Sequence, residues 1–99
     1  MKVVVGIWKI KAGKRQEFIL ESKRVSEASK DESGLLSYSF SESHLEENTF
    51  IFFEEWKDDK AISYHKSQPY FKTFIENTKE MLVEDFSGNI YSINSIHSF

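Results

Sequence analysis

Residues 50–74 read FIFFEEWKDDKAISYHKSQPYFKTF, and this stretch decides the fold. Its apolar, aromatic start, which ends at Trp56, is typical of a buried strand. The polar residues 57–59 predict a turn whose aspartates cap a helix, and His65 lies about two turns into that helix. A second aromatic cluster follows Pro69, the only proline of the chain. We therefore expect a strand, a turn and a helix to gather aromatic rings, a carboxylate and an imidazole around one pocket.

The length and the composition of the chain predict a single globular domain over residues 1–99. Its 99 residues lie near the commonest domain size, and 39% hydrophobic and 15% aromatic residues are too many for a disordered chain. The nine phenylalanines need a core, a cavity or a partner to face. Because so short a chain buries only a modest share of its surface, association with a second subunit would add stability.

Charge and composition argue against several classes of protein. The net charge of −3 and the interleaving of acids with bases argue against a nucleic-acid partner. The chain has no cysteine, and His44, His65 and His97 lie far apart, so we expect no metal site. The first residues carry charges inside their apolar run, unlike a signal peptide, and no run is long enough to cross a membrane. We expect a cytoplasmic protein without a membrane partner.

Hydrophobic periodicity predicts the order strand, helix, strand, strand, helix, strand. The expected bounds are strands over 2–11, 35–43, 49–56 and 89–97, a helix over 14–30, a polar connection over 44–48, and a helix over 58–68 continued by a second helical piece over 69–82. Gly34, after the first helix, is expected to adopt a left-handed or tight-turn conformation. Gly6 marks either a packing gap or a space left for a ligand.

This order predicts an α+β fold of the ferredoxin-like type, an antiparallel sheet with helices on one face. The strands over 2–11 and 49–56 are apolar on both faces, although the helices can cover only one face of the sheet. We therefore expect the bare face to meet a second copy of the chain in a symmetric homodimer.

A series of short motifs follows the first predicted helix. The motifs are Gly34-Leu35-Leu36-Ser37-Tyr38, Asn48-Thr49-Phe50, Phe53-Glu54-Glu55-Trp56, Ala61, His65 and Ser67-Gln68-Pro69-Tyr70-Phe71-Lys72. This series resembles the antibiotic biosynthesis monooxygenase (ABM) domain family. The resemblance covers roughly residues 3–82 and is carried by the order and spacing of the motifs. It implies a dimeric α+β barrel with a pocket in each subunit between sheet and helices. It also implies a monooxygenase that oxidises a phenol or quinol without flavin, haem or metal.

Two other activities occur in this family and are alternatives to the monooxygenase activity. Residues 65–73, HKSQPYFKT, resemble the isomerase that processes the phosphorylated signal autoinducer-2, and that reading requires Lys66, Lys72 or an arginine to face the pocket. Haem-degrading members would have a ligating histidine where Ile75 stands, an asparagine near Gly6 and a tryptophan near His65, and all three are absent. A non-catalytic dimer that binds a small ligand is a further alternative.

His65 and Glu54 are the candidate catalytic residues. An imidazole titrates near neutral pH, so His65 can serve as a general base that removes a phenolic proton, and the electron-rich phenolate can reduce dioxygen directly. The alternative is a histidine that only packs. Glu54 shares one strand face with Phe50, Phe52 and Trp56, where a carboxylate must be paired or protonated. It either forms an ion pair across the sheet or dimer interface, or orients His65 or acts as an acid–base group; Glu55 could equally be the buried one.

Six aromatic residues are candidates for the walls of a substrate pocket, although each could simply belong to the core. Their number relative to the chain length favours a flat, aromatic substrate. The two tyrosines among them could also donate a hydrogen bond to an oxyanion. The six are Trp8, Tyr38, Phe52, Tyr64, Phe71 and Phe74.

Overall fold

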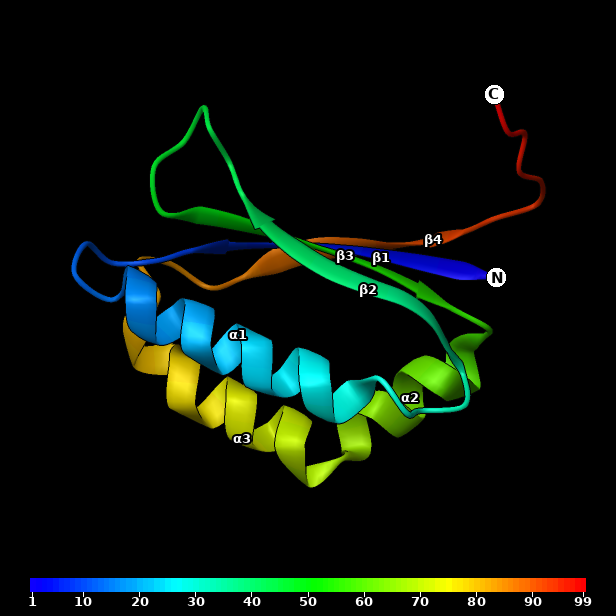
Figure 1. Cartoon of the computed structure of the whole chain (residues 1–99), viewed down its shortest axis with the longest axis horizontal. Coiled ribbons are helices and arrows are strands. Elements are labelled where there is room, and N and C mark those ends of the chain that lie inside the picture. The colour runs from blue at the N-terminus through cyan, green and yellow to red at the C-terminus, as the bar shows by residue number, and fades with distance from the viewer.

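The computed structural model describes residues 1–99 and contains a four-stranded sheet with its helices on one face (Figure 1). No helix is long and apolar enough to span a bilayer. The elements, in chain order, are β1 (Lys2–Lys9), α1 (Arg15–Ser29), β2 (Leu35–Glu42), β3 (Thr49–Trp56), α2 (Asp59–Ser67), α3 (Pro69–Thr78), the 3-10 helix η1 (Lys79–Met81) and β4 (Ser87–Ser92).

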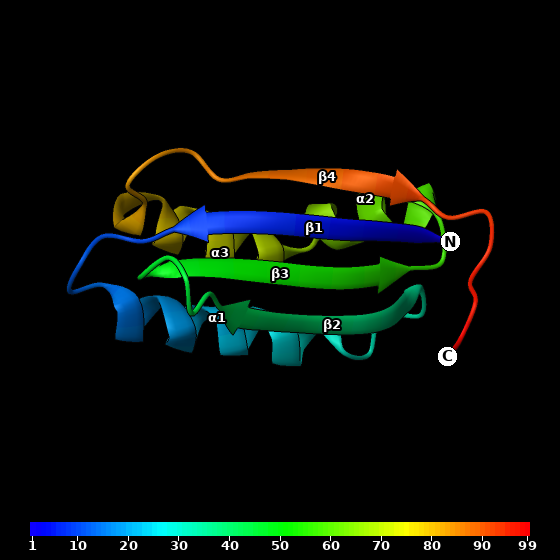
Figure 2. The same cartoon turned by 90° about the horizontal axis from the view of Figure 1, so that it is seen from above.

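The sheet order is β2-β3-β1-β4, and every neighbouring pair is antiparallel (Figure 2). This is the predicted ferredoxin-like arrangement, which is thereby confirmed. In the central pair, Gly6 lies opposite Phe52 and Trp8 lies opposite Phe50. Since side chains alternate along a strand, this register places large rings of β1 and β3 on the same face.

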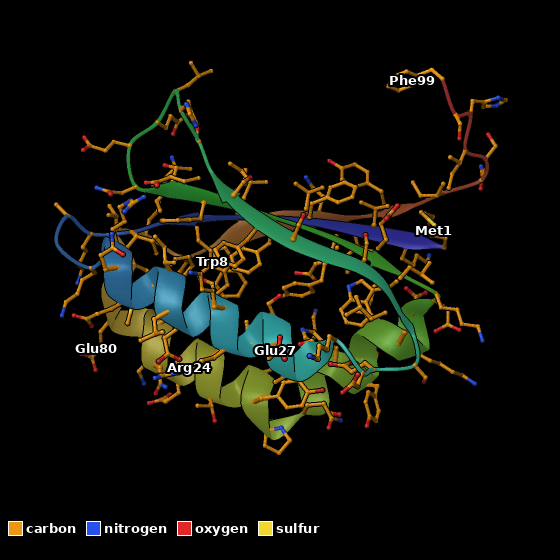
Figure 3. The ribbon with its side chains drawn as sticks, in the orientation of Figure 1. Met1, Trp8, Arg24, Glu27, Glu80 and Phe99 are labelled. Atoms are coloured by element: carbon orange, nitrogen blue, oxygen red, sulfur yellow. The ribbon has the colours of Figure 1, made fainter.

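The core lies between this face and the helical layer, as the position of Trp8 in Figure 3 shows. One face of α1 is buried, and it consists of Phe18, Ser22, Val25 and Ser29, which recur every three or four residues. Phe18 packs on Phe50 with the ring centroids 4.9 Å apart. Phe74, from α3, contacts the same cluster. The helices therefore cover the aromatic face of the sheet along most of its length.

The last strand is shorter and begins earlier than the sequence predicts. It spans Ser87–Ser92 instead of 89–97, and all six of its residues are exposed. The physical reason is the length of its partner: Ser92 pairs with Lys2, the first residue of β1, so the residues beyond it have almost no backbone left to pair with. The predicted helical piece over 69–82 likewise stops at Thr78 and tightens into η1.

Gly34 lies in a tight turn, one of the two predicted alternatives, in which the backbone N–H of Leu35 donates to the Glu32 carbonyl at 3.1 Å. The left-handed alternative is wrong, and a glycine is required here by a close approach of two elements. Its φ is not positive; among the glycines only Gly13 has a positive φ. A Cβ added to Gly34 would overlap the Cβ of Ala61 in the first turn of α2. The backbone N–H of Lys57 also donates to the Gly34 carbonyl at 2.8 Å. The glycine lets the loop before β2 lie directly against α2.

Substitution of Gly34 and Ala61 tests this contact. Gly34→Ala should lower the free energy of unfolding by about 1–3 kcal/mol, because the new methyl group is overpacked. Ala61→Gly alone should cost about 1 kcal/mol through its lower helix propensity. The double variant should be more stable than the sum of the two losses, since Ala61→Gly vacates the space that the new methyl group needs. Urea denaturation of the four proteins measures this coupling, and strictly additive losses would contradict the contact.

Candidate functional site

A cavity of about 450 Å³ lies between the sheet and the α2–α3 part of the helical layer. All four strands contribute to it, and so do α2, α3 and the segment before β4. Its lining is mainly apolar with a few polar groups, which is the usual composition of a small-molecule site. The residues are Val4, Gly6, Trp8, Tyr38, Phe52, Glu54, Ile62, His65, Lys66, Phe71, Phe86, Ser87, Gly88, Asn89 and Ile90.

Four of the six predicted wall residues line this cavity: Trp8, Tyr38, Phe52 and Phe71. The other two do not. Phe74 is in the core, with its ring centroid 5.2 Å from that of Trp8. Tyr64 is 57% exposed, because it directly precedes His65 on α2 and successive helical residues point about 100° apart. It lies instead at a separate surface hollow beside Gly34.

The position of His65 follows from how α2 begins and which face it buries. Asp58 caps the helix, its carboxylate accepting the backbone N–H of Ala61 at 2.9 Å. His65 follows Ile62 by three positions on the helix, so both side chains lie on the inner face and both are buried. The side chain of His65 is only 4% exposed, and its ring packs against the rings of Trp56 and Phe71, with centroid distances of 4.7 Å and 5.0 Å.

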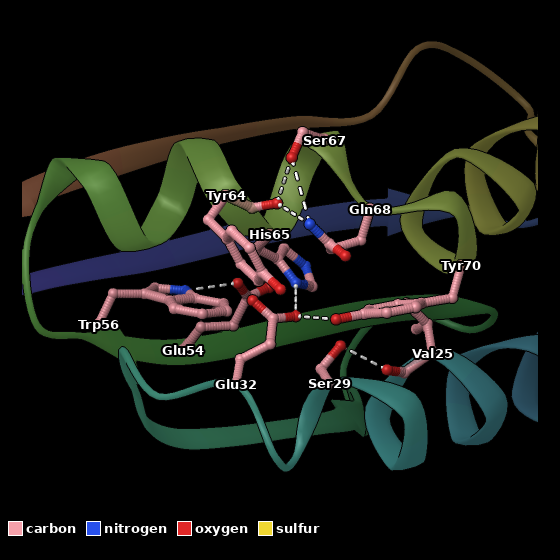
Figure 4. Close-up of polar contacts among 10 residues, drawn as sticks. All are labelled: Val25, Ser29, Glu32, Glu54, Trp56, Tyr64, His65, Ser67, Gln68 and Tyr70. Atoms are coloured by element: carbon pink, nitrogen blue, oxygen red, sulfur yellow. Dashed lines mark hydrogen bonds and ion pairs between the residues drawn. The ribbon is translucent and has the colours of Figure 1, made fainter.

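The two ring nitrogens of His65 have different surroundings. Nδ1 lies 2.8 Å from Oε2 of Glu32 (Figure 4). Nε2 has no hydrogen-bond partner in the chain, and it is not among the fully buried unpaired polar atoms. Because His65 also lines the cavity, Nε2 is the nitrogen available to a bound molecule.

Glu32 is the residue of this site that the sequence analysis missed. It was expected only as part of the turn after the first helix, yet its side chain is 4% exposed. Oε2 also accepts a hydrogen bond from the Tyr70 hydroxyl at 2.6 Å (Figure 4). A local signal existed, since an acidic residue just past a helix C-terminus is electrostatically unfavourable and therefore needs another reason to stand there.

Glu54 lies on the inner face and Glu55 on the outer face of β3, which answers the question the sequence left open. Glu54 lines the cavity and accepts the indole N–H of Trp56 at 2.9 Å. Within the chain Glu54 forms no ion pair with a lysine or arginine and no hydrogen bond with His65, whose Nδ1 instead contacts Glu32. Glu55 accepts a hydrogen bond from the Ser37 hydroxyl at 2.5 Å.

Burial changes the protonation of two groups on the cavity wall. It raises the pKa of Glu54 to about 7, and the Trp56 N–H and the charge of Lys66 only partly oppose this. Burial also raises the pKa of Tyr38, with further contributions from the charges of Glu54 and Glu32, so its hydroxyl stays protonated. The Tyr38 hydroxyl has no partner in the chain. Near neutral pH the site thus offers a neutral hydroxyl donor and a carboxyl group that can give or take a proton.

The raised pKa of Glu54 predicts a pH-dependent effect of Glu54→Gln on stability. The native chain keeps this proton up to about pH 7, whereas the unfolded chain releases it near the ordinary value of 4.5. The wild type therefore loses stability as pH rises between these values, and the variant does not. The stability of Glu54→Gln relative to wild type should increase by about 3 kcal/mol between pH 4 and pH 8. Urea denaturation at both pH values measures it, and an unchanged difference would exclude a buried, protonated Glu54.

Comparison with known proteins identifies the family. The sequence profile described as antibiotic biosynthesis monooxygenase matches residues 1–77. An uncharacterized protein of Synechocystis is 42% identical over 91 residues, which cover 92% of this chain and 62% of that protein; the chain thus spans less than two thirds of its length. The Bacillus subtilis protein named "Putative monooxygenase YcnE" is 37% identical over 82 residues, 83% of this chain and 86% of that protein.

Solved structures share the fold. A crystal structure from Deinococcus radiodurans, described as a "putative antibiotic biosynthesis monooxygenase", superposes with a TM-score of 0.93 at 21% identity, covering 100% of this chain and 98% of that one. At this identity the likeness concerns the fold alone. Together with the profile match over most of the chain, the comparisons lead to one conclusion: the chain belongs to the antibiotic biosynthesis monooxygenase family.

Proposed function

We propose that this protein is a monooxygenase that oxidises a phenol or quinol in the cavity beside His65, without flavin, haem or metal. The observation that carries the proposal is a buried imidazole with an unpaired Nε2 at the wall of an aromatic cavity of about 450 Å³. The family membership supports an oxygenase over other uses of such a cavity.

In this reaction His65 removes the phenolic proton through Nε2. The phenolate transfers electrons to dioxygen, one oxygen atom enters the substrate and the other leaves as water. The atoms balance for a quinol, since a quinol and dioxygen give a hydroxyquinone and water. The substrate itself therefore supplies all of the electrons, and the protein has to bind, orient and deprotonate it.

The remaining cavity residues have roles that fit this substrate class. Trp8, Phe52 and Phe71 offer flat apolar surfaces for an aromatic ring. The Tyr38 hydroxyl donates a hydrogen bond to the developing phenolate or to the reduced oxygen. Glu54, whose pKa burial raises to about 7, gives a proton to the leaving water.

Oxygen consumption with a panel of quinols tests the role of His65. His65→Ala should lower kcat by about 10²- to 10⁴-fold, because the general base is lost while the cavity remains. His44→Ala is the matched control, since His44 is exposed in the β2–β3 connection, and it should keep the wild-type rate. Equal rates in wild type and His65→Ala would refute His65 as the base.

A second candidate is an isomerase of a small phosphorylated ketone, and the position of Lys66 favours it. Lys66 lines the cavity and can bind a phosphate there, whereas Lys72 is exposed and does not line it. An isomerase turns over without oxygen, so assays with and without oxygen separate the two candidates. Saturable binding without turnover under either condition would instead indicate a non-catalytic binding protein.

We further propose a homodimer formed through the outer face of the sheet. No helix covers this face (Figure 1), and its centre is a contiguous apolar patch made by β1, β3 and β4. Phe53 at 42% and Tyr91 at 48% exposure leave large rings in water. Two copies packed face to face would bury them, as in the dimeric α+β barrel. The residues that this face leaves exposed or partly exposed are Val5, Ile7, Ile51, Phe53 and Tyr91, whereas Val3, which pairs with Tyr91, is already buried within the chain.

Replacement of Phe53 by glutamate tests this interface. A carboxylate at the centre of the patch would have to lose its hydration on association, so Phe53→Glu should give a monomer. Leu20→Glu is the control, because Leu20 is 51% exposed on α1, on the opposite side of the molecule, and this variant should keep the wild-type mass. Size-exclusion chromatography with light scattering reads the mass. A wild-type monomer, or a dimeric Phe53→Glu, would refute the interface.

A further inference from the structure

Three elements that are distant in sequence bring polar groups to a single oxygen atom. Glu32 lies in the loop between α1 and β2, His65 on α2 and Tyr70 in the first turn of α3. Nδ1 of His65 and the hydroxyl of Tyr70 lie 2.8 Å and 2.6 Å from Oε2 of Glu32 (Figure 4). The side chains of Glu32 and His65 are each 4% exposed, so this contact is shielded from water.

The surroundings of Glu32 determine which partners donate. No lysine or arginine lies within ion-pair distance of its carboxylate. Within the chain, His65 and Tyr70 are the partners of Oε2, whereas Oε1 is buried without a hydrogen-bond partner. Burial, and then the hydrogen bond to Glu32, raise the pKa of Tyr70, so the tyrosine keeps its proton and donates it. An ionised carboxylate can only accept, and the contact with Nδ1 therefore calls for an N–H on that nitrogen.

A neutral imidazole carries one proton, so an N–H at Nδ1 leaves the lone pair on Nε2. Nε2 is the nitrogen without a partner in the chain, and His65 lines the cavity. We propose that Glu32 is a positioning residue: its carboxylate holds the His65 proton on Nδ1 and thereby keeps Nε2 as the base that faces the substrate. This inference deepens the proposed function and rests on it.

Glu32 acts through His65 and not on the substrate. It is absent from the cavity lining and instead borders a separate surface hollow together with Ser33, Gly34 and Lys57. The charged and titratable groups that surround the imidazole from the packed elements are Tyr38 on β2, Glu54 on β3, Lys66 on α2 and Tyr70 on α3. Of these groups, Tyr38, Glu54 and Lys66 line the cavity, and substitution of Glu32 leaves them in place. Such a substitution should therefore change the tautomer of His65 without changing substrate binding.

Nitrogen-15 NMR of the ¹⁵N-labelled chain at neutral pH tests the inference without any ligand. In the wild type, His65 should be in the Nδ1–H form. In Glu32→Gln the side-chain amide can either accept or donate, so the Nε2–H form should appear or dominate. Glu55→Gln removes a carboxylate of the same type from the outer face and should leave the wild-type tautomer. A wild-type His65 in the Nε2–H form, or equal tautomer populations in wild type and Glu32→Gln, would overturn the proposal; the wild-type spectrum decides even if the variant does not fold.

Kinetics provide the second measurement. With the quinols that the wild type oxidises, Glu32→Gln should lower kcat by about 10²- to 10⁴-fold, the range expected when a general-base histidine takes the wrong tautomer, and should leave KM within about twofold. A KM effect with unchanged kcat would contradict a positioning role. If the wild type oxidises none of the quinols, the proposed function fails, while the tautomer of His65 still shows whether Glu32 positions it.

Discussion

The pairing of β1 with β3 is the constraint on which the rest of this structure depends. Its register places Trp8 opposite Phe50 and Val4 opposite Glu54, with all four side chains toward the helices. Because side chains alternate along a strand, a slip of one residue would turn the rings and the carboxylate to the outer face and empty both core and cavity. The aromatic core of α1 and α3 can form only against this register, and so can the cavity under α2.

The cavity exists because side chains fill the space between the helical layer and the sheet in one part of the molecule but not in the other. Near Phe18 and Phe74 large rings fill the space between the layers. Towards the other end of the sheet, β1 presents Gly6, and a Cβ there would meet only ordinary contacts at 3.6 Å or more. Gly6 thus lines the cavity, in agreement with the interpretation of that glycine as space. The aromatic residues around it are preorganised by their packing against the filled part of the core.

Two carboxyl groups flank His65 in different environments: Glu32 is buried, whereas Glu54 is partly buried on the cavity wall. Glu32 has two hydrogen-bond partners, Nδ1 of His65 and the Tyr70 hydroxyl. Glu54 has only the Trp56 indole N–H as a neutral donor, and its pKa is raised to about 7. The raised pKa of Glu54 supports the proposal that this group acts as an acid in the reaction.

The sequence by itself determined the kinds of elements, their order and the buried stripes, since hydrophobic periodicity directly records which face of an element is apolar. It also singled out His65, Glu54 and four aromatic residues that line the cavity. Only the tertiary structure decided which groups meet. The contact between Glu32 and His65 joins positions 33 residues apart, and Gly34 packs on Ala61 between the same two segments, a pairing that no local pattern encodes. The exposure of Tyr64 and the end of β4 at Ser92 were decided in the same way, by the rotation of a helix against the sheet and by the length of a neighbouring strand.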